Sequence, residues 1–258
     1  VDRDECISGL SRVAYAGRSD GSRMLLQISH AGIMAPQTLT GHDAVGPSGG
    51  HPLGSPGSRA MTDEEIAAVP ELFAAAARRA QEAGFDGVQL HAAHGFLLHE
   101  FLSPFFNHRT DEYGGDQTKR SRLAVETVQA VRKACGPDFV IAAKLSAIDD
   151  LDAPGMVASN PNGMTVEQCL YSAQLMEKVG LDLVEVSGGI CANMDTERTP
   201  MKRKLIGKGY FLEQARIFHQ GLNIPVIAIG GIRSLETAQE VIQHDIADFV
   251  GLCRPLIR

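Results

Sequence analysis

Short apolar runs recur along the chain, separated by longer stretches in which apolar and polar positions alternate with helical spacing. The runs are nearly continuous in hydrophobic side chains and rich in β-branched residues and leucine, which is typical of parallel strands covered on both faces. We therefore predict six strands. They span residues 24–28, 87–90, 139–145, 181–186, 224–229 and 247–252.

Amphipathic helices are predicted between these strands. The clearest begins at Thr62, which precedes Glu65 by three positions in the pattern of a capping box. Gly136 and Gly180 are suited to end two other helices, and Ser234 is suited to cap the start of the last one. The predicted helices span residues 1–16, 62–83, 121–135, 165–179, 210–220 and 234–244.

Regular alternation of strands and helices indicates an α/β fold with one parallel sheet and right-handed crossovers. A repeated unit, in which a helix end leads through an acidic residue into a strand, favours a barrel over an open sheet. A closed (β/α)₈ barrel has eight strands and the pattern predicts six. We therefore expect a partial TIM-type barrel forming a single domain over residues 1–258, with the first two strands missing. The two sheet edges left unpaired would then be prone to association.

Composition narrows the class of protein. A formal net charge of −7 without a basic patch argues against nucleic-acid binding. Five scattered cysteines without a C-x-x-C pair indicate a reduced, cytoplasmic protein without a disulfide framework or zinc knuckle. No apolar run approaches the ~20 residues of a membrane-spanning helix, and no signal-peptide pattern opens the chain. We expect a cytoplasmic protein with a small-molecule partner, and homo-oligomer formation is left open.

Candidate chemistry lies at the carboxyl ends of the strands, where barrel active sites are found. His91 and His94 follow the second predicted strand, and two such imidazoles can both donate to one substrate oxygen that gains negative charge. Their spacing also allows a plain structural role, in which one caps a helix and the other lies at the surface. A metal site with His99 or Glu100 is a further alternative, but it lacks a third ligand at a fixed spacing.

Glycines after the fifth predicted strand suggest a binding site for an anion. Gly230 and Gly231 precede a helix capped at Ser234, so backbone N–H groups and a helix N-terminus can face a phosphate. Arg254, after the last strand, can add positive charge. Phosphate sites at the last two strands are frequent in barrels, although a tight turn alone also requires glycine.

Two polar residues lie inside apolar strands. Lys144 needs an anionic or polar partner if it is buried, because an unpaired buried charge is costly; otherwise its stem leans outward and its amine reaches water. Gln27 can offer an amide donor and acceptor to a heterocycle. Neither residue is decisive alone.

One long segment makes a family resemblance clear. Residues 90–116, LHAAHGFLLHEFLSPFFNHRTDEYGGD, resemble the signature segment of the Old Yellow Enzyme family of NAD(P)H-dependent flavin oxidoreductases. The segments LLQISHAG (25–32), IPVIAIGGI (224–232) and CRPLIR (253–258) occur in the order of that family. The resemblance covers essentially the whole chain.

The resemblance implies an FMN-binding flavoprotein with NADH or NADPH as a transient hydride donor. Gln27 would contact the pyrimidine ring of the flavin. Lys144 would approach its N1/O2 edge, where a positive charge favours the reduced form. Gly230, Gly231 and Arg254 would hold the phosphate.

The implied reaction is that of an ene-reductase. Hydride would pass from NAD(P)H through the flavin to the activated C=C bond of an enone or enal, while His91 and His94 bind the carbonyl oxygen. Two positions depart from the family. Phe96 stands where a tyrosine usually donates the proton, and Cys253 stands beside the phosphate site where many relatives have glycine.

Two other functions compete with this interpretation. The missing strands and Phe96 both favour a truncated, catalytically silent barrel remnant with weak or no flavin binding. A metal-dependent barrel hydrolase using His91 and His94 is a third class, which the signature segment disfavours.

Overall fold

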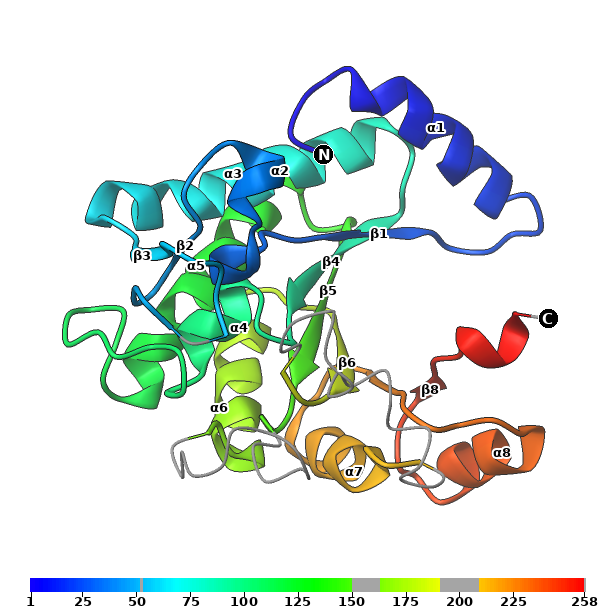
Figure 1. Cartoon of the computed structure of the whole chain (residues 1–258). Coiled ribbons are helices and arrows are strands. Elements are labelled where there is room, and N and C mark those ends of the chain that lie inside the picture. Colours follow the sequence, from blue (N-terminus) through cyan, green and yellow to red (C-terminus); the bar gives the residue numbers. More distant parts are fainter. Residues whose placement is uncertain (52, 150–162, 191–208, 258) are drawn as a thin grey trace.

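The computed structural model describes residues 1–51, 53–149, 163–190 and 209–257, and of Arg254 only the backbone (Figure 1). A parallel sheet organises the chain, with its strands in the order β1-β4-β5-β6-β7-β8. All six strands predicted from the sequence are confirmed. Their bounds are Leu25–Ile28 for β1, Gly87–Ala92 for β4, Val140–Ser146 for β5, Leu183–Ser187 for β6, Val226–Ala228 for β7 and Phe249–Val250 for β8.

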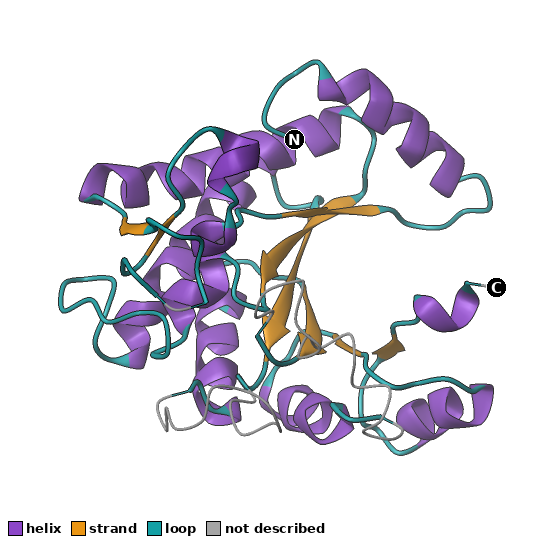
Figure 2. Cartoon of the chain, viewed as in Figure 1, coloured by secondary structure: helices purple, strands orange, loops and turns teal. Residues whose placement is uncertain are grey.

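Helices cover the outer face of this curved sheet (Figure 2). The six predicted helices are confirmed, with ends shifted by at most five residues. They are α1 Cys6–Gly17, α3 Asp63–Glu82, α5 Gln117–Cys135, α6 Val166–Glu177, α7 Leu212–Gly221 and α8 Leu235–Gln243. The capping box of Thr62 and Glu65 and the cap at Ser234 are both formed. None of the helices in the described segments is both long and apolar enough to cross a bilayer.

Several short elements were not predicted. Helix α4, Leu97–Leu102, follows β4 directly, and the 3₁₀ turn η3, Arg254–Leu256, follows β8. The loop at 31–61 contains a 3₁₀ turn (η1, Gly32–Met34) and helix α2 (Gln37–Thr40). It also contains a two-stranded parallel pair, β2 (Val45–Gly46) with β3 (Arg59–Ala60).

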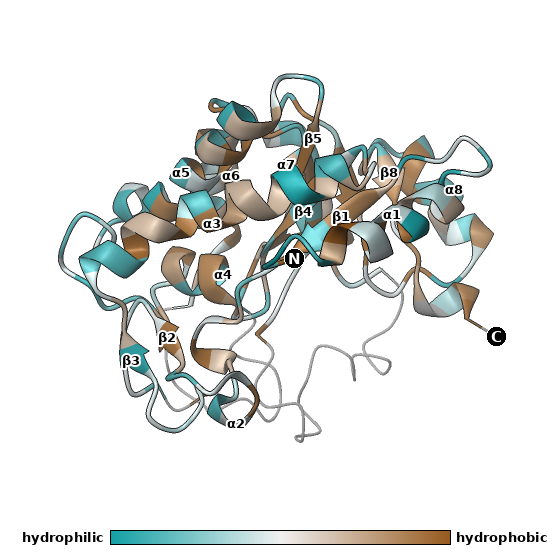
Figure 3. Ribbon diagram, turned by 90° about the horizontal axis from the view of Figure 1, so that it is seen from above, coloured by the Kyte–Doolittle hydropathy of each residue, from teal (hydrophilic) through white to brown (hydrophobic). Residues whose placement is uncertain are grey.

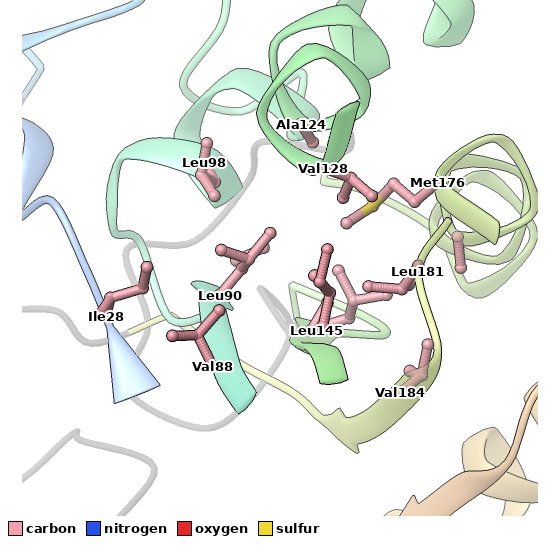
Figure 4. Packing of buried hydrophobic residues seen from close by; sticks show 14 of the residues in the cluster. Ile28, Val88, Leu90, Leu98, Ala124, Val128, Leu145, Met176, Leu181 and Val184 are labelled. Carbon is pink, nitrogen blue, oxygen red and sulfur yellow. The ribbon is translucent and has the colours of Figure 1, made fainter. Parts of the chain in front are cut away.

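Alternation along the strands separates two environments. Side chains such as Val88, Leu90 and Val184 are fully buried and point toward the helices, where they pack with Val128 and Met176 (Figure 4). The helices carry both hydrophobic and hydrophilic segments, as expected when one face packs against a sheet (Figure 3). The opposite face of the sheet carries the polar positions, which lie on the inside of its curve.

The sheet ends in two edges, β1 and β8, and is not closed. Figure 1 shows β1 beside α1 at one end of the curve and β8 beside α8 at the other. The fold is therefore α/β and corresponds to six consecutive strands of a TIM-type barrel. This agrees with the partial barrel predicted from the sequence.

Candidate active site

A cavity of about 870 Å³ lies at the carboxyl ends of the strands. It is bounded on one side by residues of β5 and β6 and on the other by the turns after β7 and β8. Parallel strands end on one side of a sheet, so residues far apart in sequence meet there. The lining includes His94, Lys144, Glu185, Ser187, Gly230, Gly231 and Cys253.

The two histidines lie in ring contact. His91 is on the inner face of β4 and pairs in register with Lys144, and its ring centroid is 5.3 Å from that of His94 in an edge-to-face arrangement. His94 lines the cavity itself. The structure thus brings the predicted pair together, with His94 in the cavity lining and His91 against it. Phe96 packs on the other side of His91, with ring centroids 4.6 Å apart.

His94 has a left-handed backbone conformation with φ of 63°. Such a conformation is uncommon outside glycine and is kept only where the surroundings enforce it. Its N–H donates to Ser146 Oγ at 2.9 Å, and Ser146 Oγ in turn donates to the carbonyl of Gly189. The ring Nε2 lies 2.7 Å from Ser187 Oγ at the end of β6. Backbone and ring of His94 are therefore both fixed by neighbouring strand ends.

His91 is a neutral hydrogen-bond donor at neutral pH. Burial, followed by the charge of Lys144 and the proximity of His99, lowers the pKa of His91 to about 4. Its Nδ1 accepts a hydrogen bond from the Ala93 N–H at 3.3 Å. Because Nδ1 is the acceptor, the single N–H of the neutral ring is on Nε2, which can donate a hydrogen bond.

Another histidine, His99, is buried next to this turn and holds it by hydrogen bonds. His99 Nδ1 accepts from the Gly95 N–H at 2.9 Å, and His99 Nε2 lies 2.8 Å from Asp149 Oδ1. Both side chains are almost fully buried. Glu100 points elsewhere, because its Oε1 accepts from the Ile33 N–H at 2.9 Å. Neither residue joins His91 and His94, and the described segments contain no group of three or more His, Cys, Asp or Glu side chains suited to a metal ion.

Polar side chains form a ladder across the inner face of the sheet. Gln27 Nε2 donates to Gln89 Oε1 at 2.6 Å, and Gln89 Nε2 donates to Glu185 Oε2 at 2.8 Å. The amine of Lys144 lies 2.9 Å from Glu185 Oε1. Lys144 therefore has the anionic partner that its position requires. Gln27 is exposed at the sheet edge and reaches the cavity only through this ladder.

Sequence reasoning missed Gln89 and Glu185. Gln89 lies two positions before His91, and Glu185 lies two positions before Ser187. Because alternate residues of a strand share a face, the inward position of His91 and Ser187 was the signal that could have identified them.

The turn after β7 has the geometry expected for binding an anion. Gly230 and Gly231 have φ of 96° and 72°, which glycine alone adopts without strain. A Cβ on Gly230 would come within 2.7 Å of the Tyr210 ring and 2.8 Å of the Phe211 ring. Within the described segments neither glycine N–H donates a hydrogen bond to the protein.

The remaining parts of this turn are placed as follows. Ser234 accepts from the Thr237 N–H and caps α8, whose N-terminus follows the two glycines. Cys253 is exposed and lines the cavity. The predicted contribution of Arg254 concerns a side chain that lies outside the described residues.

Comparison with known proteins gives a consistent relationship. The model of the NADH:flavin oxidoreductase / NADH oxidase family matches residues 1–258. A metal reductase of Desulforamulus reducens is 35% identical over 261 residues, which cover 100% of this chain and 37% of that relative. An NADPH dehydrogenase of Bacillus velezensis is 36% identical over 258 residues, which cover 99% of this chain and 69% of that relative.

Solved structures agree with this relationship. The Old Yellow Enzyme homologue of Zymomonas mobilis matches with a TM-score of 0.77 and 27% identity, over 97% of this chain and 68% of that protein. The chain thus spans little more than a third of the first curated relative and about two thirds of the shorter ones. The match over the whole chain shows that it belongs to the NADH:flavin oxidoreductase / NADH oxidase family, the Old Yellow Enzyme family that residues 90–116 resemble.

Proposed function

We propose that the chain forms the flavin-binding part of an NAD(P)H-dependent oxidoreductase, with FMN held in the cavity at the strand ends. One observation carries this proposal. A single cavity is lined by a glycine turn suited to phosphate, by the Lys144–Glu185 pair and by His94.

The residues present fit FMN. A cavity of about 870 Å³ is within the ~300–1,000 Å³ typical of cofactor and ligand sites. The N–H groups of Gly230 and Gly231 donate to no group of the described segments and lie next to the α8 N-terminus, which suits the phosphate. Arg254 would add positive charge there, and the Cys253 side chain would border the phosphate. The flavin ring would lie toward Lys144, with Gln27 at the far end of the polar ladder.

When bound, FMN supplies the hydride chemistry, accepting a hydride from NADH or NADPH and passing it to an acceptor. The protein's part is orientation and electrostatics. His91, neutral and protonated on Nε2, donates to an acceptor oxygen that gains negative charge. Such a donor typically contributes ~10²–10³ in rate. His94 supplies the second hydrogen bond when it exchanges Ser187 for the acceptor.

We further infer that the acceptor is an α,β-unsaturated carbonyl compound such as an enone or enal. Two imidazoles that both donate to one oxygen would suit a carbonyl conjugated to the bond being reduced, because charge then develops on that oxygen. Phe96, in contact with His91, would form an apolar wall for the substrate and has no proton to give.

FMN titration of the purified 258-residue chain tests the proposal. We expect saturable quenching of flavin fluorescence. Gly230→Ala should weaken FMN binding about tenfold or more, because its Cβ would clash with Tyr210. Gly136→Ala is the matched control, since Gly136 also has a positive φ (82°) but open space around it, at the end of α5. Equal affinity for both variants would contradict binding at the glycine turn.

A second candidate is the catalytically silent remnant. It is favoured by the open sheet, in which Phe249 on the inner face of β8 is 53% exposed. Under this alternative the chain binds FMN weakly and loses it on gel filtration. Full retention of FMN, followed by anaerobic bleaching with NADH or NADPH, would eliminate the remnant. Absence of FMN binding at any concentration would exclude the proposed function as a flavin-binding oxidoreductase.

A further inference from the structure

An acidic residue lies in the wall of the proposed flavin cavity. Glu185 and Lys144 both line it, with side chains 15% and 20% exposed. Their closest charged atoms are 2.9 Å apart. A flavin site would be expected to use the lysine charge, yet the structure supplies that charge with a partner on the adjacent strand.

The position of Glu185 is enforced from both sides. Its Oε1 is taken by Lys144 and its Oε2 by Gln89, whose amide is oriented in turn by Gln27. Gln89 reaches Glu185 across β5, where the register partner of Gln89 is Ala142, which is small and buried. The two carboxylate oxygens of Glu185 are thus each held by a different donor, Lys144 on one side and Gln89 on the other.

We infer that Glu185 is a positioning and charge-balancing residue for the flavin. It holds Lys144 in place and cancels most of its charge, so that this wall offers FMN a nearly neutral ion pair instead of a free cation. The inference rests on the proposed function, because it assumes FMN in this cavity.

The consequence is a definite sign of the effect on reduction potential. Reduced flavin carries more negative charge than oxidised flavin near neutral pH, so a nearby anion disfavours reduction and a nearby cation favours it. Removing the negative charge at Glu185 should therefore raise the midpoint potential of bound FMN. Removing the positive charge at Lys144 should lower it.

The experiment measures the midpoint potential of FMN bound to the 258-residue chain by equilibration with redox dyes, at FMN saturation. For Glu185→Gln we expect binding of reduced over oxidised FMN to improve about tenfold, equal to about +30 mV for a two-electron couple. For Lys144→Met we expect a shift of similar size in the opposite direction. Shifts of opposite sign in the midpoint potential would identify the side-chain charge as the cause, because a general loosening of the cavity has no reason to reverse the sign between the two variants.

Two further variants keep the test decisive if Glu185→Gln folds poorly. Glu185→Asp keeps the charge and should stay near the wild-type potential. Glu82→Gln removes an equal charge from the exposed end of α3 and should change nothing. A Glu185→Asp shift as large as that of Glu185→Gln, or shifts of one sign for Glu185→Gln and Lys144→Met, would overturn the inference. Lack of any FMN binding by the wild-type chain would instead overturn the proposed function, and the inference with it.

Discussion

Phe96 is the residue at which the proton supply of the proposed reaction can be tested. It packs against His91 with ring centroids 4.6 Å apart, so a hydroxyl on this ring would lie near the substrate. General acid catalysis is typically worth ~10²–10⁴ in rate. We therefore expect Phe96→Tyr to accelerate enone reduction by about 10² or more and to leave flavin reduction by NAD(P)H unchanged. Stopped-flow separation of the two half-reactions measures both.

The matched control for this substitution is Phe105→Tyr. Phe105 is also half-buried but contacts His51 and Phe106, away from the histidine pair. It should alter neither half-reaction. Unchanged enone turnover in Phe96→Tyr would mean that a hydroxyl at position 96 does not supply the proton to the substrate.

Glu100 should make stability depend on pH. It is fully buried. Among the described residues its Oε1 accepts only the Ile33 N–H and its Oε2 has no hydrogen-bond partner. Burial raises the pKa of Glu100 well above its ordinary value of 4.5. Burial therefore favours the neutral acid in the folded state. The stability that this form contributes is complete below about pH 4.5 and is lost as the pH rises toward the folded-state pKa.

Urea unfolding of wild type and Glu100→Gln between pH 5 and pH 9 checks this prediction. Glutamine stays neutral, so the free energy of unfolding of wild type should fall relative to the variant as the pH rises. The comparison uses the pH dependence of the free energy of unfolding and not its absolute value. The new amide of Glu100→Gln also lacks a hydrogen-bond partner, which costs about 1–3 kcal/mol of stability. Parallel pH profiles would show that the Glu100 carboxyl does not titrate differently in the folded state.

At the residue scale, sequence pattern identified residues at strand ends and one of the two charged residues within strands that line the cavity. His94, Lys144, Gly230 and Gly231 were singled out and line one cavity. Glu185 was missed because a charged residue in a short apolar run gives no sign of its partner. That partner, Lys144, is set by strand order and register, which pair the two residues directly.

At the element scale, the capping box of α3 offers a direct test. Thr62 Oγ1 accepts from the Glu65 N–H at 3.2 Å, and Glu65 Oε2 accepts from the Thr62 N–H at 2.9 Å. Thr62→Ala should lower the free energy of unfolding by about 1 kcal/mol. Urea denaturation measures this loss, with the exposed Ser22→Ala as a control expected to be neutral. Equal stability of both variants would mean that the α3 N-terminus is already frayed.

Elements with one buried face were predicted, and those outside that pattern were not. Every residue of α4 is buried, including its two polar residues His99 and Glu100, so the sequence of this six-residue helix does not separate a solvent face from a core face. Helix α5 begins four residues before the prediction because Asp116 accepts from the Lys119 N–H and starts a polar first turn. When an N-cap is followed by a polar first turn, no apolar residue marks the start of the helix in the sequence.

At the scale of the whole molecule, alternation of strands and helices was sufficient to predict the parallel sheet. The order of the strands along it follows the chain, as short right-handed crossovers require. The short pair of β2 and β3 could not be predicted, because two residues per strand carry no periodicity.

The open edge at β8 should make the 258-residue chain self-associate. An apolar hollow of about 540 Å³ lies between α8 and β8, and its lining residues Leu235, Ile242 and Phe249 are 71%, 49% and 53% exposed. An unpaired strand beside exposed apolar side chains offers both hydrogen bonds and hydrophobic area to a second copy.

We expect Ile242→Lys to weaken association about tenfold or more in sedimentation velocity. Leu72→Lys alters a side chain that is 60% exposed on α3, which packs against α5 and away from the β8 edge, and should have no effect. If both lysine substitutions weaken association equally, net charge and not the β8 edge controls self-association. A wild-type chain that stays monomeric at every concentration would mean that the twist and short length of β8 already protect this edge.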